Sequence, residues 1–392
     1  MPSIVIASIA RTPIGKFCGS LQSLKGSDLG AVAIRGALAH LPDDLPIREA
    51  FLGNVVSAGM GQAPARQAVL GAGLPLSTIC TTVNKVCASG LKATMLAAQS
   101  LQCQPEGAVL AGGFESMSNI PHYLPNSRSG TTLGHVQLLD GAVLDGLWDV
   151  YNDQHMGMCG EKCAKDYNFS REDQDAYAIE SYRRAQAAIE AGVFEEVVPV
   201  EVPQRRGDPV VFAQDEEPKS IKLDKVPTLK PAFDRKNGTV TAANASPLND
   251  GGAALVLMTD EEAASRGIQP LARILGYGDA EQDPVDFTTT PSMAVPVALK
   301  HAGLTATDVE YHEINEAFSV VALANMQLLN LEHSRVNAFG GAVALGHPIG
   351  MSGARILGTL YQVLKHKDAT VGCASICNGG GGASAMIIER LT

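Results

Sequence analysis

The chain repeats itself, and this repeat limits the folds open to it more than any other feature of the sequence. Four segments recur in the same order about 262 residues further along. The first copies are residues 30–41, 51–56, 89–93 and 108–113, and the second copies are residues 293–304, 313–318, 352–356 and 371–376. A separation that stays nearly constant over four segments predicts two similar structural units in one chain.

Each unit alternates helical and strand patterns. In both copies a helical segment leads into an apolar strand, and the pairs Ser89-Gly90 and Ser352-Gly353 each open a further helix that precedes another strand. This alternation predicts βαβ units with parallel or mixed sheets. Strands that are apolar throughout are typical of sheets covered on both faces. The predicted fold class is therefore α/β, with two similar βαβ-repeat domains packed together.

A long segment without a counterpart lies between the two units. It is rich in Gly, Pro, Asp and short polar loops, and it contains one clear amphipathic helix, predicted from Arg171 to about Ala191 with Ser170 as N-cap and Asp173 in the capping box. Loop-rich insertions of this size often bind substrate. We expect an N-terminal α/β domain, an insertion domain over the substrate site and a C-terminal α/β domain, formed by residues 1–118 with about 248–268, by residues 119–247, and by residues 269–392.

Charge and hydropathy exclude some classes of function. The formal net charge of −11, without a basic patch, argues against nucleic-acid binding. No run of about eighteen apolar residues is present, so no membrane span is expected. The sequence begins with strand-like residues 3–9, and neither end resembles a targeting signal. We expect a cytoplasmic protein, with the mature form of a mitochondrial protein as the alternative.

The eight cysteines lie mostly in apolar segments, where a free buried thiol is usual. The pairs Cys159/Cys163 and Cys373/Cys377 are four positions apart, which is not the spacing of a zinc site. Reduced thiols are typical of an intracellular enzyme.

Cys87 is the first candidate catalytic residue. Strand-like residues 82–86 precede it, and the helix that opens at Ser89 follows it. A helix N-terminus favours the thiolate, and an exposed thiolate is the reactive form of cysteine. An isolated cysteine in this setting is more often a small core residue. Here the small neighbours Ala88 and Gly90 leave room for a ligand and favour a nucleophile.

His347 is the second candidate. It lies between Gly346 and Pro348 in the glycine-rich loop 340–350, which is not typical of core packing. A tight loop holds an imidazole in one orientation, as a general base for a thiol requires. This loop precedes the second Ser-Gly helix as the Cys87 loop precedes the first. Twofold packing of the two units would therefore bring Cys87 and His347 to one site.

Two further candidates follow strands of the second unit. Cys377 ends the last repeated strand and precedes Asn378 and four glycines. These glycines lack the Lys-Ser/Thr of a phosphate loop, but they allow backbone N–H groups to approach a ligand, as an oxyanion hole requires. Asn315 ends an earlier strand, where it positions a water or a carbonyl, or is a satisfied turn residue.

Four motifs together resemble the thiolase family over essentially the whole chain: Asn-Lys-Val-Cys-Ala-Ser-Gly at 84–90, Asn-Glu-Ala-Phe at 315–318, Gly-His-Pro-Ile-Gly at 346–350 and Cys-Asn-Gly-Gly-Gly at 377–381. The resemblance implies a thiolase-like fold of alternating α and β layers with a loop-rich insertion. His155-Met156-Gly157 and residues 145–153 resemble the eukaryotic members that act on acetyl-CoA and acetoacetyl-CoA.

The resemblance implies a reversible Claisen condensation of two acetyl-CoA molecules to acetoacetyl-CoA and CoA. His347 would take the proton of Cys87, which would carry the acetyl group. Cys377 would deprotonate the second acetyl-CoA, and Asn315 would hold a water at the enolate. The oxyanion would be bound by the backbone N–H groups of Cys87 and Gly379.

The family also implies substrate contacts, an ion and an assembly. The expected CoA contacts are His155, Met156, Lys225, Ser246, Ala317 and Phe318. Some members bind potassium, for which the matching residues are Tyr182, Ala242, Ala243, Ala245 and Val343; a loop held without an ion is the alternative. No cofactor is required for the chemistry, and a homodimer or homotetramer is expected.

Three other functions compete with this prediction. A longer-chain 3-ketoacyl-CoA thiolase of β-oxidation shares the catalytic residues and differs in its acyl pocket. A decarboxylating ketosynthase on the same fold would have a different set in place of Cys377. A non-catalytic acyl-CoA-binding protein would have no need of both cysteines and His347.

Overall fold

The protein, described by a computed structural model over residues 2–130 and 132–392, is built around a large mixed sheet. The strand order is β14-β15-β16-β13-β1-β12-β5-β3-β4, and the short β2 pairs with β12. The first unit contains β1 (Ile4–Arg11), β2 (Gly15–Lys16), α1 (Gly26–Leu38), β3 (Ile47–Gly53), α2 (Pro64–Gly71), β4 (Ile79–Val83), α3 (Ser89–Cys103), β5 (Ala108–Ser116), β12 (Asn249–Thr259) and α7 (Asp260–Ser265). The second contains β13 (Ala272–Glu281), η5 (Pro284–Thr289), α8 (Pro291–Ala302), η6 (Ala306–Asp308), β14 (Tyr311–Ile314), α9 (Ser319–Leu329), η7 (His333–Arg335), α10 (Ala342–Leu345), α11 (Ser352–His366), β15 (Val371–Asn378) and β16 (Gly382–Arg390).

Apart from β4, which pairs with β3 at one edge, the strand order is symmetrical about the junction of β1 and β13. In the first unit β1 pairs antiparallel with β12, β12 antiparallel with β5, and β5 parallel with β3. In the second unit β13, β16, β15 and β14 repeat these relations in the same sequence. The junction itself pairs Val5 with Arg273 and Ile6 with Ala272. The predicted α/β class with two βαβ repeats is therefore confirmed, and the sheet is mixed because each unit ends with an antiparallel strand.

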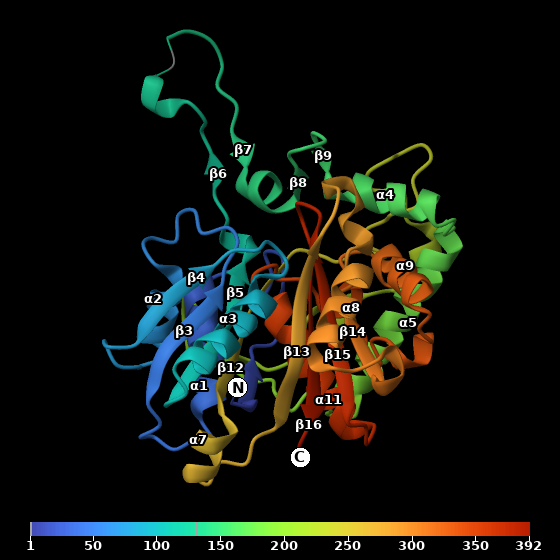
Figure 1. Cartoon of the computed structure of the whole chain (residues 1–392). Coiled ribbons are helices and arrows are strands. Elements are labelled where there is room, and N and C mark those ends of the chain that lie inside the picture. The colour runs from blue at the N-terminus through green and yellow to red at the C-terminus, as the bar shows by residue number, and fades with distance from the viewer. Residues whose placement is uncertain (1, 131) are drawn as a thin grey trace.

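Helices and sheet alternate in layers (Figure 1). Side chains of adjacent strand residues point to opposite faces, and a Cβ at Gly251 would meet Met351 and Pro348, whereas one at Gly252 would meet Leu29 of α1. Helix α1 therefore covers the outer face of the first unit, and α8 packs on β13 and β16 of the second. Helices α3 and α11 pack on each other between the two halves of the sheet.

Two glycines allow α3 and α11 to approach so closely. A Cβ on Gly90 would lie 2.8 Å from the backbone nitrogen of Ala354, and one on Gly353 would lie closer still to the backbone nitrogen of Leu91. No side chain fits at a contact between two backbones. The Ser-Gly pair that marks each repeat in the sequence is thus the point where the repeats meet.

The insertion lies over one end of the sheet and extends into an arm (Figure 1). Its elements are η1 (Met117–Asn119), β6 (His122–Tyr123), η2 (Ser127–Ser129), β7 (Leu139–Asp140), the π-helix η3 (Val143–Leu147), β8 (Trp148–Asp149), β9 (Gln154–His155), α4 (Met156–Asp166), α5 (Arg171–Glu190), β10 (Val200–Val202), β11 (Val210–Phe212), α6 (Glu217–Ser220) and η4 (Leu223–Thr228).

The predicted insertion helix is confirmed as α5, with Ser170 as N-cap and Asp173 closing the capping box. The division into three domains stays a prediction, which the symmetry of the sheet supports. Within the described residues, no helix has both the length and the apolar composition to cross a bilayer.

Candidate active site

Cys87 lies in a sharp elbow between β4 and α3. Val86 adopts a left-handed backbone conformation, with φ of 46°. The hydroxyl of Ser89 accepts a hydrogen bond from the backbone nitrogen of Lys85 at 2.8 Å and donates one to the carbonyl of Val86 at 2.6 Å. Ser89 therefore fixes the elbow, because a strained φ persists only where the surroundings determine it.

The Cys87 side chain is buried rather than exposed, at 6% relative exposure. Burial raises the pKa of its thiol to about 11, while the backbone N–H groups of Gly379 and Cys87 donate toward the sulfur and lower it by less. The expectation of an exposed thiolate at the helix start was therefore wrong, since burial outweighs the helix dipole. Cys87 rests as a thiol and needs a base.

His347 is fully enclosed and uncharged. Burial lowers the pKa of His347 to about 3, and the positive charge of Arg355 contributes in the same direction. Its Nδ1 lies 2.6 Å from the hydroxyl of Ser352, which itself donates to the carbonyl of Pro348 at 2.9 Å. A hydroxyl has one proton to give. Nδ1 is therefore the protonated nitrogen, and Nε2 is free to accept a proton.

Asn315 lies at Nε2 of the same imidazole. Its Nδ2 is 3.4 Å from His347 Nε2, and its Oδ1 accepts a hydrogen bond from Arg355 at 3.2 Å. A guanidinium only donates, so the oxygen end of the amide faces Arg355 and the NH₂ end faces His347. Asn315 thus contacts the predicted base, from the end of β14 where it was expected.

Cys377 is fully buried on β15, and burial raises the pKa of its thiol well above the ordinary value. A negative charge on Cys87 raises it further, so the two sulfurs lie within electrostatic reach of each other. Gly379 follows in the turn between β15 and β16, next to Val86 and Met156. The structure therefore brings the two cysteines and Gly379 together from opposite units of the repeat.

A cavity of about 310 Å³ opens beside this group. Its lining includes Val86, Met156, Phe287, Gly379 and Gly380. The remaining lining comes from Pro284 of η5 and from residues 144–146 and 148–151 of the insertion. The cavity thus connects the Cys87 elbow with the insertion.

The predicted CoA-contact residues mostly cluster at this end of the molecule. His155 caps α4, with Nδ1 accepting from the backbone nitrogen of Gly157 at 3.0 Å, and its ring stacks on Phe233 with centroids 4.6 Å apart. Phe233 meets Phe318 edge to face at 6.2 Å. Ser246 donates from both its backbone nitrogen and its hydroxyl to the carbonyl of Ala317.

Lys225 does not join this cluster. It lies in η4 with its side chain 65% exposed, and its ammonium is 3.7 Å from the carboxylate of Asp224. No contact to the other predicted CoA residues is present among the described residues.

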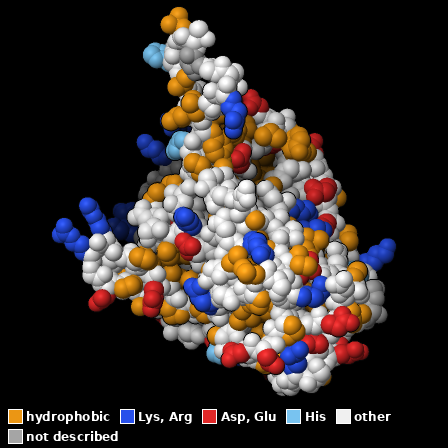
Figure 2. All heavy atoms as spheres, turned by 90° about the vertical axis from the view of Figure 1, so that its left-hand side faces the viewer, with side chains coloured by type: hydrophobic (Ala, Val, Ile, Leu, Met, Phe, Trp, Pro, Cys, Tyr) orange, Lys and Arg blue, Asp and Glu red, His pale blue; other side chains and the backbone are white. Residues whose placement is uncertain are grey.

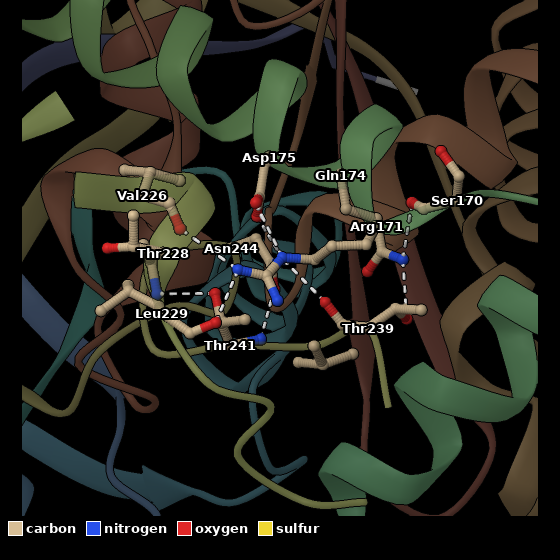
Figure 3. A network of polar contacts seen from close by, with 12 residues as sticks. Ser170, Arg171, Gln174, Asp175, Val226, Thr228, Leu229, Thr239, Thr241 and Asn244 are labelled. Atoms are coloured by element: carbon tan, nitrogen blue, oxygen red, sulfur yellow. Dashed lines mark hydrogen bonds and ion pairs between the residues drawn. The ribbon is translucent and has the colours of Figure 1, made fainter. Parts of the chain in front are cut away.

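The loop that carries Ser246 is held by the start of α5 (Figure 3). Asn244 donates to Asp175 at 2.9 Å and to the carbonyl of Thr239 at 3.0 Å, and its own oxygen accepts from the backbone nitrogen of Thr241 at 2.7 Å. Arg171 pairs with Asp175 at 2.7 Å and also donates to carbonyls of the η4 segment. This network fixes the shape of residues 239–244.

The residues expected at a potassium ion offer the right kind of ligand. No hydrogen bond within the described part of the chain ends on the carbonyl oxygens of Ala242, Ala243 or Val343. The hydroxyl of buried Tyr182 likewise has no hydrogen-bond partner there. Burial, together with the negative charges of Glu217 and Glu316, raises the pKa of this hydroxyl. Unused oxygens beside acidic groups fit a hard cation.

Three residues without a predicted role also belong to the site. Ser352 and Arg355 orient the His347–Asn315 pair, and Glu115 accepts hydrogen bonds from Asn54 and from the backbone nitrogens of residues 55, 56 and 350. Burial raises the pKa of Glu115 to about 7. Ser352 and Arg355 stand in a repeated segment, so comparison of the repeats could have found them.

Known proteins resemble this chain over its whole length. Residues 4–261 match the N-terminal domain of thiolase, and residues 268–390 match the C-terminal domain. A cytosolic acetyl-CoA acetyltransferase of Gibberella zeae is 55% identical, covering 100% of this chain and 99% of its own. Acetyl-CoA acetyltransferase 1 of Arabidopsis thaliana is 56% identical, with 99% and 94% covered. A mitochondrial acetyl-CoA acetyltransferase of Homo sapiens is 54% identical, with 100% and 91% covered.

A solved structure is similar in fold as well. A thiolase of Ascaris suum in complex with coenzyme A superimposes with a TM-score of 0.93 at 47% identity, covering 99% of this chain and 100% of that one. The predicted thiolase-like fold is therefore confirmed. Both domain matches and the full-length relatives show that the chain belongs to the thiolase family.

Proposed function

We propose that this enzyme joins two acetyl-CoA molecules to acetoacetyl-CoA and CoA, reversibly, through an acetyl group carried on Cys87. One observation carries the proposal: the Cys87 thiol receives backbone N–H groups from two units of the fold and lies within electrostatic reach of Cys377. The names of the full-length relatives support the same reaction. They do not favour the longer-chain alternative.

In the first half-reaction His347 Nε2 takes the proton of Cys87. The thiolate attacks the acetyl carbonyl carbon, and the N–H groups of Cys87 and Gly379 stabilise the oxyanion that forms. The carbon–sulfur bond to CoA then breaks, and the leaving sulfur takes the proton of the Cys377 thiol. Cys377 is left as a thiolate, and His347 keeps its proton on Nε2. A single oxyanion-hole donor is commonly worth about 3 kcal/mol of barrier, which is needed here because burial opposes ionisation of the thiol.

In the second half-reaction the Cys377 thiolate removes a proton from the methyl group of another acetyl-CoA. The enolate oxygen is held by His347 and by a water on Asn315. The carbanion attacks acetyl-Cys87, a carbon–carbon bond forms, and the Cys87 thiolate leaves and takes back its proton from His347. Two cysteines are required because the first is occupied by the acetyl group.

The CoA moiety is proposed to lie along the insertion. His155, Met156, Ser246, Ala317 and Phe318 are proposed to contact it. Met156 lines the cavity beside Gly379, His155 and Phe318 pack on Phe233, and Ser246 donates to Ala317, which supports this placement. Lys225 is proposed to contact the nucleotide phosphates, for which its exposed ammonium is suited. The CoA bound to the Ascaris suum relative supports binding of CoA in general.

A potassium ion is proposed between Tyr182 and the carbonyls of Ala242, Ala243, Ala245 and Val343. When bound, it would neutralise the nearby acidic groups and fix the position of residues 242–246. The chain's own contribution is the set of oxygens left without hydrogen-bond donors.

The protein is proposed to form a homodimer or homotetramer in the cytoplasm. The arm of residues 120–130 and 132–140 projects from the body, and Figure 2 shows hydrophobic side chains along it. Leu124, Leu133, Val136 and Leu138 are 41%, 95%, 54% and 58% exposed. Exposed apolar side chains on a projecting arm are suited to contact between subunits. A relative named as cytosolic supports the compartment, and a mitochondrial mature form is the alternative.

The proposal is tested by intact mass after incubation with acetyl-CoA and by condensation assays. Wild type and Cys377→Ala are expected to gain one acetyl group, and Cys87→Ala none, because only Cys87 is the acyl carrier. Condensation is expected to fall by at least ~10³-fold in both variants, since each loses an essential group. Cys18→Ala, at an exposed thiol, is the matched control. Acetylation of the Cys87→Ala variant at another thiol, or full condensation by Cys377→Ala, would contradict the proposal.

A further inference from the structure

Arg355 is buried beside the catalytic group, although no step of the proposed reaction uses it. Its side chain is 1% exposed and projects from α11 toward the end of β14. One guanidinium nitrogen donates to Asn315 Oδ1 at 3.2 Å. A second lies 3.9 Å from the carboxylate of Glu313, which is equally buried.

The pairing of Arg355 with Glu313 is incomplete. Nε and Nη1 of Arg355 have no hydrogen-bond partner among the described protein atoms, nor has either carboxylate oxygen of Glu313. A buried ion pair stabilises a fold only when its geometry is good and its remaining donors and acceptors are satisfied. This pair meets neither condition, so fold stability does not account for the arginine. Its one short contact is to Asn315.

That contact decides which way the Asn315 amide faces. The two ends of an amide have nearly the same shape, but only the oxygen accepts hydrogen bonds. With Arg355 present, the NH₂ group faces His347 Nε2 at 3.4 Å. A reversed amide would present its oxygen to Nε2 and favour a proton there. The imidazole would then be unable to accept the proton of Cys87.

Ser352 acts on the other nitrogen of the imidazole. Because its proton goes to the Pro348 carbonyl, Nδ1 must be the donor. Arg355 and Ser352 stand three positions apart on α11 and therefore on the same face of the helix. One turn of α11 thus determines the protonation of both imidazole nitrogens of His347.

We propose that Arg355 is a positioning residue, which fixes the orientation of the Asn315 amide and thereby keeps Nε2 of His347 free to act as the base. The inference rests on the proposed function, since it assigns Arg355 a place in that reaction. The inference extends the proposed function to a residue that touches neither the substrate nor the reacting atoms.

A double-mutant cycle on kcat tests the inference. Arg355→Lys keeps the positive charge but loses the planar guanidinium that donates to Asn315, and is expected to lower kcat by ~10- to 100-fold. The KM for acetyl-CoA should stay within about twofold, because the substrate contacts remain. In an Asn315→Ala background the same change is expected to cost less than about threefold, because there is no amide to orient. A purely structural role would give equal losses in both backgrounds, and this result would overturn the inference.

Two further variants keep the result interpretable. Lys92→Met, at the equivalent position of the first repeat, should change kcat by less than about twofold. If Arg355→Lys fails to fold, Arg355→Met combined with Glu313→Gln removes the buried guanidinium together with the ionisable group next to it, and should show the same dependence on Asn315. Full activity of Arg355→Lys with an active wild type refutes only this inference. Absence of an acetyl-enzyme in wild type refutes the proposed function itself.

Discussion

The two Ser-Gly turns of the repeat occupy equivalent positions in the fold, but the serines fix different predicted catalytic residues. In the first unit Ser89 fixes the elbow of Cys87, and in the second Ser352 fixes the imidazole of His347. Three residues on, the first helix carries Lys92, 27% exposed and paired with Asp279 at 2.7 Å. The second helix carries Arg355, which is buried and holds Asn315.

Under the proposed function, this difference lets one repeated backbone supply both a nucleophile and its base. The ion pair of Lys92 is partly solvated, and such a pair contributes little to the free energy of unfolding. Arg355, at the same position of the second unit, is buried, where a cation is costly in free energy unless it is paired and hydrogen-bonded. Burial, rather than the local backbone, separates the two roles.

The largest effect is expected at the contact that both units share. Gly90→Ala and Gly353→Ala each drive a methyl group against the backbone of the other helix, and each should lower the free energy of unfolding by more than ~3 kcal/mol or prevent folding. Chemical denaturation of purified variants measures this. Gly71→Ala on α2, where the new methyl would meet only the Ala31 side chain at 3.3 Å, is the control. A large loss at only one of the two glycines would break the symmetry of the comparison.

The two serines are expected to differ in what they affect. Ser352→Ala leaves His347 Nδ1 without its acceptor and should lower kcat by ~10-fold or more, with little change in KM. Ser89→Ala removes two hydrogen bonds of the elbow and should cost about 1–2 kcal/mol of stability, with kcat reduced by less than about threefold. Steady-state kinetics and thermal unfolding on the same samples separate these effects. Equal kinetic losses in both variants would show that the elbow needs its serine as much as the base does.

The most gradual effect is expected in the pH dependence of stability, because the pKa shifts of the carboxylates next to Arg355 and Lys92 have opposite signs. Burial, with both oxygens unpartnered, raises the pKa of Glu313 to about 8 against the ordinary 4.5, although Arg355 opposes this shift. The contribution of Glu313 to the free energy of unfolding is therefore fully present below about pH 4.5 and is lost as the pH rises toward 8. The pKa of Asp279 is lowered to about 2, because hydrogen bonds from Lys85, Lys92 and Ser384 outweigh its burial. Its contribution is constant above about pH 4 and is lost only as the pH falls toward 2.

The measurement is thermal unfolding between pH 5 and 8.5. The stability of wild type relative to Glu313→Gln should fall as the pH rises, by up to about 1 kcal/mol per pH unit. The stability of wild type relative to Asp279→Asn should stay level over the same range. A level curve for the Glu313→Gln comparison would mean that Arg355 keeps this carboxylate ionised.

Sequence alone predicted the features that depend on local pattern and on the repeat. The symmetry of the sheet follows from the repeated order of helices and strands, and the meeting of the Cys87 and His347 loops follows from twofold packing of equal units. The helix α5 was predicted within one residue because its capping box is local.

The features that sequence did not predict depend on contacts between distant segments. Helix α4 contains Gly157 and Gly160, which weaken a helical pattern. Gly157 is required because the ring of Phe233 packs where a Cβ would stand, whereas a Cβ at Gly160 would only touch Phe318 at an ordinary distance. The burial of Cys87 comes from the second unit, which a helix-terminus argument cannot include. The role of Arg355 depends on which way the Asn315 amide faces, and the spacing of residues along the sequence does not show this.

The position of Gly379 has a consequence for the order of synthesis. The ribosome makes Cys87 early, but its N–H donor Gly379 lies in the turn between β15 and β16, almost 300 residues later in the chain. A nascent chain that has already folded its first unit therefore holds the nucleophile without its oxyanion hole, without Cys377 and without His347. Under the proposed function, we therefore expect acyl transfer to begin only after the second unit has been made and has folded against the first.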